Sequence, residues 1–181
     1  MMRGLAVIAL ALVLTTACTE EVIFDFEENL QEELLVIDQF LNENQIPFQQ
    51  LDNGIRYRFL AEGSGASIDL KDTVRSFYAV YLLDSTLIDS NIREVLDANG
   101  ATNRGSEVLT DVIETGLDDN WRYQFYNEAY KLSKEGTRLQ LFIPSYLAFG
   151  TYTRTWGFVN EVPGNTPVMF EVEVTDLIKV D

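Results

Sequence analysis

The stretch Gly136-Thr-Arg-Leu-Gln-Leu-Phe-Ile-Pro-Ser-Tyr-Leu-Ala-Phe-Gly150 decides the fold of this chain. Leu139, Leu141 and Ile143 recur with a period of two, which predicts a strand with one buried face and the intervening side chains on the other face. Pro144 has no N–H to donate, so we expect the strand to end there. The residues that follow predict a short helical turn closed by the final glycine, where left-handed backbone costs little.

Segments on either side of this stretch predict more strands and one helix. Asp72–Leu83 is the most strand-like of them, because valine and aromatic residues dominate it. In Trp121–Ser133 the apolar residues recur at helical spacing instead. Many strands around one helix predict an α+β fold, with a curved antiparallel β-sheet wrapped around that helix. The other segments with strand patterns are Gly54–Leu60, Thr86–Ser90 and Val168–Val180.

An amphipathic helix is expected ahead of this domain, from Glu27 to about Asn44. Its apolar residues recur every three or four positions, and Glu and Gln fill the opposite positions. We expect this helix to pack on its own domain, with a seam to a partner helix as the alternative. The apolar stripe is Leu30, Leu34, Ile37 and Leu41, widened by Leu35, Val36 and Phe40.

Two segments show no regular pattern. Asn91–Asn120 is interrupted by glycines, and within it Val108–Ile113 is compatible with a helical turn or a short strand. The segment from Gly150 to Asn160 is aromatic and predicts a loop.

Composition excludes several function classes. The chain has 13 basic and 29 acidic residues, a formal charge of −16, which argues against binding to nucleic acid. It contains no histidine, so Ser-His-Asp and Cys-His chemistry and the commonest zinc ligand are absent. No calcium loop or phosphate-binding glycine motif is present either, so we expect no metal and no cofactor.

The N-terminus has the pattern of an export signal. Arg3 precedes a short apolar run, and small residues lead to the single cysteine, Cys18. The run is too short for a membrane span. The pattern is similar to a bacterial lipoprotein signal, which implies removal of residues 1–17 and lipidation of Cys18. The alternative is an ordinary secreted protein with a spare thiol. Thr19, in place of a retention aspartate, favours the outer membrane of the cell envelope.

Three separated motifs resemble those of FKBP-type peptidyl-prolyl cis-trans isomerases. Ile143-Pro-Ser-Tyr-Leu-Ala-Phe-Gly150 is similar to the family's Ile-Pro-x-x-Leu-Ala-Tyr-Gly signature. The run from Tyr78 to Ser90 resembles the family's opening, in which a tyrosine precedes Phe-Asp-Ser by a fixed interval. The interval from Tyr78 to Asp89 fits that spacing without a gap. Val162-Pro163 and Phe170–Val174 resemble its turn and closing strand. The resemblance covers Gly54 to Val180 and implies an FKBP-like fold.

The resemblance also assigns site residues. Tyr78 and Asp89 would form a polar pair at the rim of an apolar pocket, and the backbone amide of Tyr123 would receive the substrate carbonyl. Ile88, Tyr126 and Phe149 stand where the family usually has phenylalanine, tryptophan and tyrosine, so weakened activity is expected. The alternative for Tyr126, Phe149 and Phe170 is that they are core aromatics, and for Asp89 a turn carboxylate. The remaining predicted contacts are Val162 and Phe170 as pocket walls, with Trp156 and Tyr152 in a loop that either overhangs the pocket or packs on itself.

The expected function is therefore a lipid-anchored prolyl isomerase that assists the folding of proline-containing exported polypeptides. The alternative is a catalytically weak or inactive FKBP-like subunit that binds an outer-membrane protein complex. The expected organisation is a signal peptide over 1–17, a tether over 18–26, the helical segment over 27–52, and the FKBP-like domain over 53–181 with an enlarged insertion at 91–120.

Overall fold

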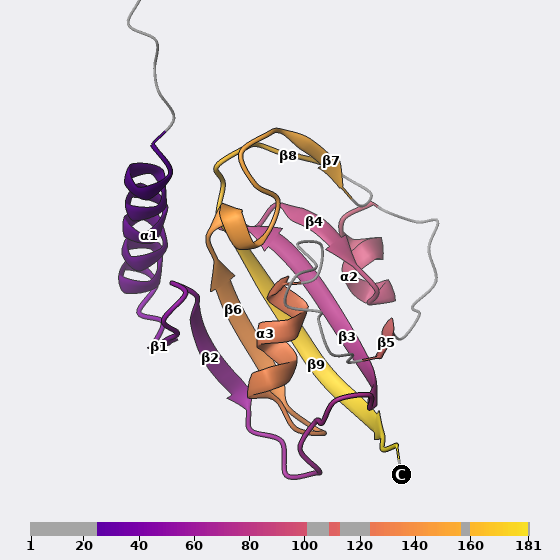
Figure 1. The fold of residues 1–181 in the computed structure, drawn as a ribbon. Helices are drawn as coiled ribbons and strands as arrows, with labels where there is room; N and C mark the ends of the chain where they lie inside the picture. The colour runs from indigo at the N-terminus through magenta and orange to yellow at the C-terminus, as the bar shows by residue number, and fades with distance from the viewer. Residues whose placement is uncertain (1–24, 101–108, 113–123, 157–159, 181) are drawn as a thin grey trace, which may run out of the picture.

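A computed structural model describes residues 25–100, 109–112, 124–156 and 160–180 (Figure 1). Within these ranges an antiparallel sheet has the strand order β1-β2-β6-β9-β3-β4, with β5 also paired to β3, and β7 and β8 form a separate hairpin. The predicted α+β class is confirmed. The strands are β1 (Gln49–Gln50), β2 (Arg56–Ala61), β3 (Thr73–Leu82), β4 (Leu87–Ser90), β5 (Leu109–Val112), β6 (Arg138–Ile143), β7 (Arg154–Trp156), β8 (Asn160–Val162) and β9 (Val168–Ile178).

One face of the sheet is covered by the predicted central helix, α3 (Gln124–Leu132), which lies across β6 and β9 in Figure 1. The helix buries Phe125, Tyr126, Ala129 and Tyr130 in the main hydrophobic cluster. Inward-facing residues of β6 and β9 belong to the same cluster, because alternate side chains of a strand point to the same face. These strand residues are Leu139, Leu141, Ile143, Phe170, Val172 and Val174.

The predicted N-terminal helix, α1 (Phe26–Glu43), begins at Asp25, whose side chain accepts hydrogen bonds from the first-turn amides of Glu27 and Glu28. It packs on its own domain, as expected. Ile37 and Leu41 are fully buried in a second cluster with Phe142 of β6. The outward side chain of β6 is therefore covered by a helix.

Two expectations about burial were wrong for the same reason. Leu35 and Val36, expected to widen the apolar face of α1, are 69% and 50% exposed, whereas Glu33 is 5% exposed. Strand β6 was expected to bury one face, but Gln140 and Phe142 on its other face are buried as well. Because α1 packs behind the sheet, both faces of the strand lie in the interior.

The segments without a regular pattern contain secondary structure. A short helix, α2 (Arg93–Ala98), follows β4, and Leu109–Val112 is a strand rather than a helical turn, since it pairs with β3. The segment expected to be a loop after Gly150 contains β7, which pairs with β8. The short 3₁₀-helix η2 (Ser145–Leu147) follows Pro144 as predicted, and Gly150 has a φ of 79°.

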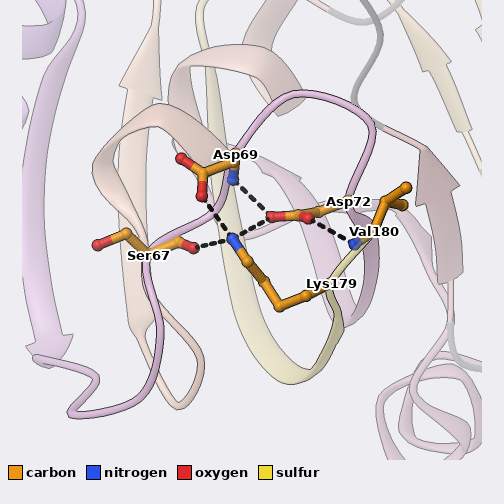
Figure 2. Close-up of polar contacts among 5 residues, drawn as sticks. All are labelled: Ser67, Asp69, Asp72, Lys179 and Val180. Carbon is orange, nitrogen blue, oxygen red and sulfur yellow. Dashed lines mark hydrogen bonds and ion pairs between the residues drawn. The ribbon is translucent and has the colours of Figure 1, made fainter.

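The end of β9 is tied to the loop that leads into β3 (Figure 2). The Lys179 ammonium contacts the carboxylates of Asp69 and Asp72 and donates to the Ser67 carbonyl. Asp72 is almost fully buried and also accepts a hydrogen bond from the Val180 amide. The ammonium holds the pKa of the Asp72 carboxyl below its usual 3.8, and the two carboxylates raise the pKa of Lys179.

Among the described helices, none is both long enough and apolar enough to cross a membrane.

Candidate active site

Strands β3 and β4 place Tyr78 beside Asp89. The two strands pair antiparallel, with Val80 opposite Asp89. The Tyr78 hydroxyl donates to Asp89 Oδ2 over 3.1 Å, and Asp89 Oδ1 accepts the Ser90 amide over 2.9 Å. Asn91 holds the backbone at Tyr78 in place, because its Oδ1 accepts a hydrogen bond from the Tyr78 amide over 2.7 Å. The predicted polar pair is thus made in the structure.

Aromatic rings from three elements meet next to this pair. Tyr126 of α3 packs edge-on against Phe170 of β9, with ring centroids 4.9 Å apart, and the Tyr78 ring lies 5.9 Å from Tyr126 and 6.2 Å from Phe170. Phe125 completes the group at 4.6 Å from Tyr126 and 5.0 Å from Phe170. We call Tyr78, Phe125, Tyr126 and Phe170 the ring cluster.

Sequence reasoning missed Phe125. It directly precedes Tyr126 in the helix, and neighbouring helical residues point in different directions, so one helical face would not be expected to bury both. Both rings are nevertheless buried in the main hydrophobic cluster, together with residues of β3, β6 and β9. The sheet therefore buries a wider stripe of α3 than the spacing along the chain indicates.

Three further predicted residues, Ile88, Phe149 and Val162, belong to the same hydrophobic cluster as the rings. Ile88 and Val162 are fully buried, and Phe149 is 4% exposed. The Phe149 carbonyl accepts Arg154 Nε over 2.8 Å, which joins the loop after β6 to β7. The structure thus brings seven of the predicted residues together: Tyr78, Ile88, Asp89, Tyr126, Phe149, Val162 and Phe170.

The other predicted residues are not placed at this site. Tyr152 is 76% exposed and does not belong to the hydrophobic cluster. The backbone of Trp156 lies in β7, but its side chain is outside the described residues, as are Tyr123 and Cys18. Contact of these residues with a substrate or lipid stays a prediction.

The chemistry available at the site is binding and desolvation. Aromatic rings and aliphatic side chains surround one hydrogen-bonded hydroxyl–carboxylate pair. In the described part of the chain, no three Asp, Glu or Cys side chains are grouped so that they could hold a metal ion. Such a site favours one conformation of a bound group over another without forming a bond to it.

Comparison with known proteins includes a match among curated sequences. The FKBP-type 22 kDa peptidyl-prolyl cis-trans isomerase of Escherichia coli is 27% identical over 127 residues, which are 70% of this chain and 52% of that protein. This chain therefore spans about half the length of the curated relative that it matches. No protein-family model matches the chain.

Solved structures show the same fold. FkpA from Escherichia coli superimposes with a TM-score of 0.57 and 22% identity, over 86% of this chain and 63% of that one. A peptidyl-prolyl cis-trans isomerase from Pseudomonas syringae superimposes with a TM-score of 0.56 and 20% identity, over 87% of this chain and 98% of that one. The N-terminal domain of FKBP42 from Arabidopsis thaliana superimposes with a TM-score of 0.57 and 17% identity, over 74% of this chain and 93% of that one. The chain has an FKBP-like fold, and the sequence match supports the FKBP-type isomerase family.

Proposed function

We propose that this protein is an FKBP-type peptidyl-prolyl cis-trans isomerase. The observation that carries the proposal is the Tyr78–Asp89 hydrogen bond beside the ring cluster. Both residues occupy the positions that the family motif gives to its polar pair, and Tyr126 and Phe170 lie where the motif gives the aromatic floor and wall. The 27% identity to an isomerase of this type supports the same activity.

The reaction needs no nucleophile, because rotation about a prolyl peptide bond breaks no covalent bond. The barrier is about 18–20 kcal/mol, and it arises from the resonance of the planar amide. A twisted amide loses this resonance and has a less polar carbonyl, so apolar surroundings that exclude water destabilise it less than the planar form. The ring cluster supplies such surroundings, and the Tyr78–Asp89 pair holds its edge in place.

We further propose that the protein is anchored at the cell envelope through lipid on Cys18 and acts on exported polypeptides that contain proline. The support is the N-terminal pattern of a basic residue, an apolar run and small residues before Cys18. Acyl chains would give a membrane affinity that an acidic protein surface lacks. Replacement of Cys18 by serine should release the protein from the membrane fraction of the producing cell; retention of this variant would contradict the anchor.

The activity is tested by an isomerisation assay with Xaa-Pro peptides on the soluble fragment Glu20–Asp181. The wild-type fragment should accelerate isomerisation, and Tyr126→Ala should abolish the acceleration. Tyr78→Phe keeps the ring and removes the hydrogen bond to Asp89, worth about 0.5–1.5 kcal/mol, so kcat/KM should fall about two- to tenfold. Leu35→Ala, on the exposed side of α1, is the control. A folded wild-type fragment without turnover would refute the proposal.

Burial of the site favours a second candidate, a catalytically weak or inactive FKBP-like binding subunit, for which we propose an outer-membrane assembly as the partner. Ile88, Val162 and Phe170 are fully buried, and Tyr126 is 8% exposed, as core residues are. This candidate predicts co-purification with a membrane complex that Tyr78→Phe does not affect. Deletion of residues 101–108, within the enlarged 91–120 segment, should abolish the association. This second candidate would be excluded if the wild-type protein catalyses isomerisation and Tyr126→Ala abolishes both the turnover and the association with the complex.

A further inference from the structure

A carboxylate of α1 is buried against the loop that carries Phe149. Glu33 is 5% exposed, and its Oε2 accepts the Ser145 amide over 2.6 Å. Its Oε1 accepts the Ser145 hydroxyl over 2.6 Å and the Asn29 side-chain amide over 2.7 Å. Burial of a carboxylate is unfavourable unless its oxygens are hydrogen-bonded, and here three donors satisfy them. The contact joins residues that lie 112 positions apart in the chain.

Ser145 in turn organises the loop after β6. Its carbonyl accepts the amides of Ala148 over 2.9 Å and Gly150 over 2.8 Å. These two residues flank Phe149, so the backbone on both sides of the aromatic side chain is tied to Ser145. Ser145 begins the 3₁₀-helix after Pro144, and its amide donates a hydrogen bond to the Glu33 carboxylate. A side chain of another helix therefore caps this turn.

A second pair of contacts holds the same loop from outside the sheet. Phe26 of α1 packs edge-on against Tyr146, with ring centroids 5.4 Å apart. The Tyr146 hydroxyl donates to the Asn53 carbonyl. Burial raises the pKa of Tyr146, and the charge of Glu128 raises it further, so the hydroxyl stays protonated and remains a donor. The turn Ser145–Leu147 is thus held by α1 on two successive residues.

We propose that Glu33 is a positioning residue of the isomerase site: through Ser145 it fixes the loop that places Phe149 in the hydrophobic cluster. The inference rests on the proposed isomerase function and extends it to a helix outside the FKBP-like domain. Glu33 does not touch the ring cluster and takes no part in the reaction. Its effect is to restrict the loop, and small displacements of site groups lower catalytic rates steeply.

The test compares three variants in the full chain. Glu33→Ala removes all three hydrogen bonds. Glu33→Gln keeps one carbonyl oxygen for the Ser145 amide and can donate to the Ser145 hydroxyl, so it is the conservative variant. Asp38→Ala is the matched control, because Asp38 also joins α1 to the domain, but by an ion pair with Arg56 of β2 (2.8 Å and 2.9 Å) and not with the loop.

Two readouts separate positioning from general stability. Hydrogen exchange at the Ala148 and Gly150 amides should be about tenfold faster in Glu33→Ala than in Asp38→Ala, with exchange in the centre of β9 equal in the two. In Glu33→Ala, kcat/KM should fall about tenfold. Glu33→Gln should restore both values to within about threefold of wild type, and Asp38→Ala should leave kcat/KM within about twofold.

The proposal is overturned if Glu33→Ala and Asp38→Ala show the same exchange at the two loop amides, or if kcat/KM is unchanged while the loop exchanges faster. If Glu33→Ala does not fold, Ser145→Ala takes its place: it removes only the hydroxyl contact, and an unchanged loop exchange then counts against the proposal. A wild-type protein without turnover refutes the isomerase function, whereas the exchange data still decide whether Glu33 fixes the loop.

Discussion

Ile37→Ala should destabilise the whole protein, because the Ile37 side chain of α1 is fully buried in a cluster with Phe142 of β6. The substitution removes three carbon atoms beyond Cβ, and about 0.8 kcal/mol for each gives about 2.4 kcal/mol. The cavity left against the rigid sheet adds about 1 kcal/mol, so we expect a loss of about 3 kcal/mol. For a protein of this size the loss corresponds to a decrease in Tm of about 6–12 °C.

Urea denaturation followed by circular dichroism measures this loss. The matched control is Leu35→Ala, on the same helix but 69% exposed, for which we expect a change below about 0.5 kcal/mol. The reasoning is refuted if the two variants are equally stable. It is also refuted if Ile37→Ala melts α1 in a separate transition and leaves the main transition unchanged, since α1 would then not belong to the cooperative unit.

Two other predictions concern the loops. Lys179→Met should lower Tm at pH 7, because Asp72 is buried and loses its cationic partner. Arg75→Met is the control: Arg75 forms an ion pair in which both side chains are about half exposed, so its loss should have little effect on Tm. The pKa of Asp72 is lowered in the folded state, so this stabilisation is present above pH 3.8 and should disappear as pH falls through the lowered value. The pKa of Lys179 is raised above 10.5, so the stabilisation should also disappear as pH rises through that raised value. A Tm difference between wild type and Lys179→Met that stays constant from pH 7 through the whole acid range would contradict this account. Gly164→Ala should destabilise the protein by about 1–3 kcal/mol, since a Cβ there would lie 2.1 Å from the Thr151 carbonyl oxygen; calorimetry showing an unchanged Tm would contradict it.

Local pattern was sufficient for the main elements of the fold. The period of two in β6 and β9 and the helical spacing in α1 and α3 are properties of consecutive residues, so they can be read before any partner is known. Pro144 ended its strand and Gly150 took a positive φ, because both effects arise from the residue's own backbone. Motif spacing indicated that Tyr78 and Asp89 would form a pair.

Pattern was insufficient where an element depends on a distant partner. β7 and β8 are three residues each, too short to show a period, and form because they pair with each other. The short helix α2 begins without a side-chain cap, so the usual sequence signal for a helix start is missing.

The N-terminal helix shows most clearly what sequence alone determined and what only tertiary structure decided. Sequence determined that residues near 27–44 form an amphipathic helix, because helical spacing is local. It did not determine that Glu33 is buried while Leu35 is exposed, because burial depends on the surface against which the helix packs. Glu33 lies on the apolar stripe, three residues after Leu30 and four before Ile37, and can be buried there because Ser145, 112 residues later, supplies two hydrogen-bond donors.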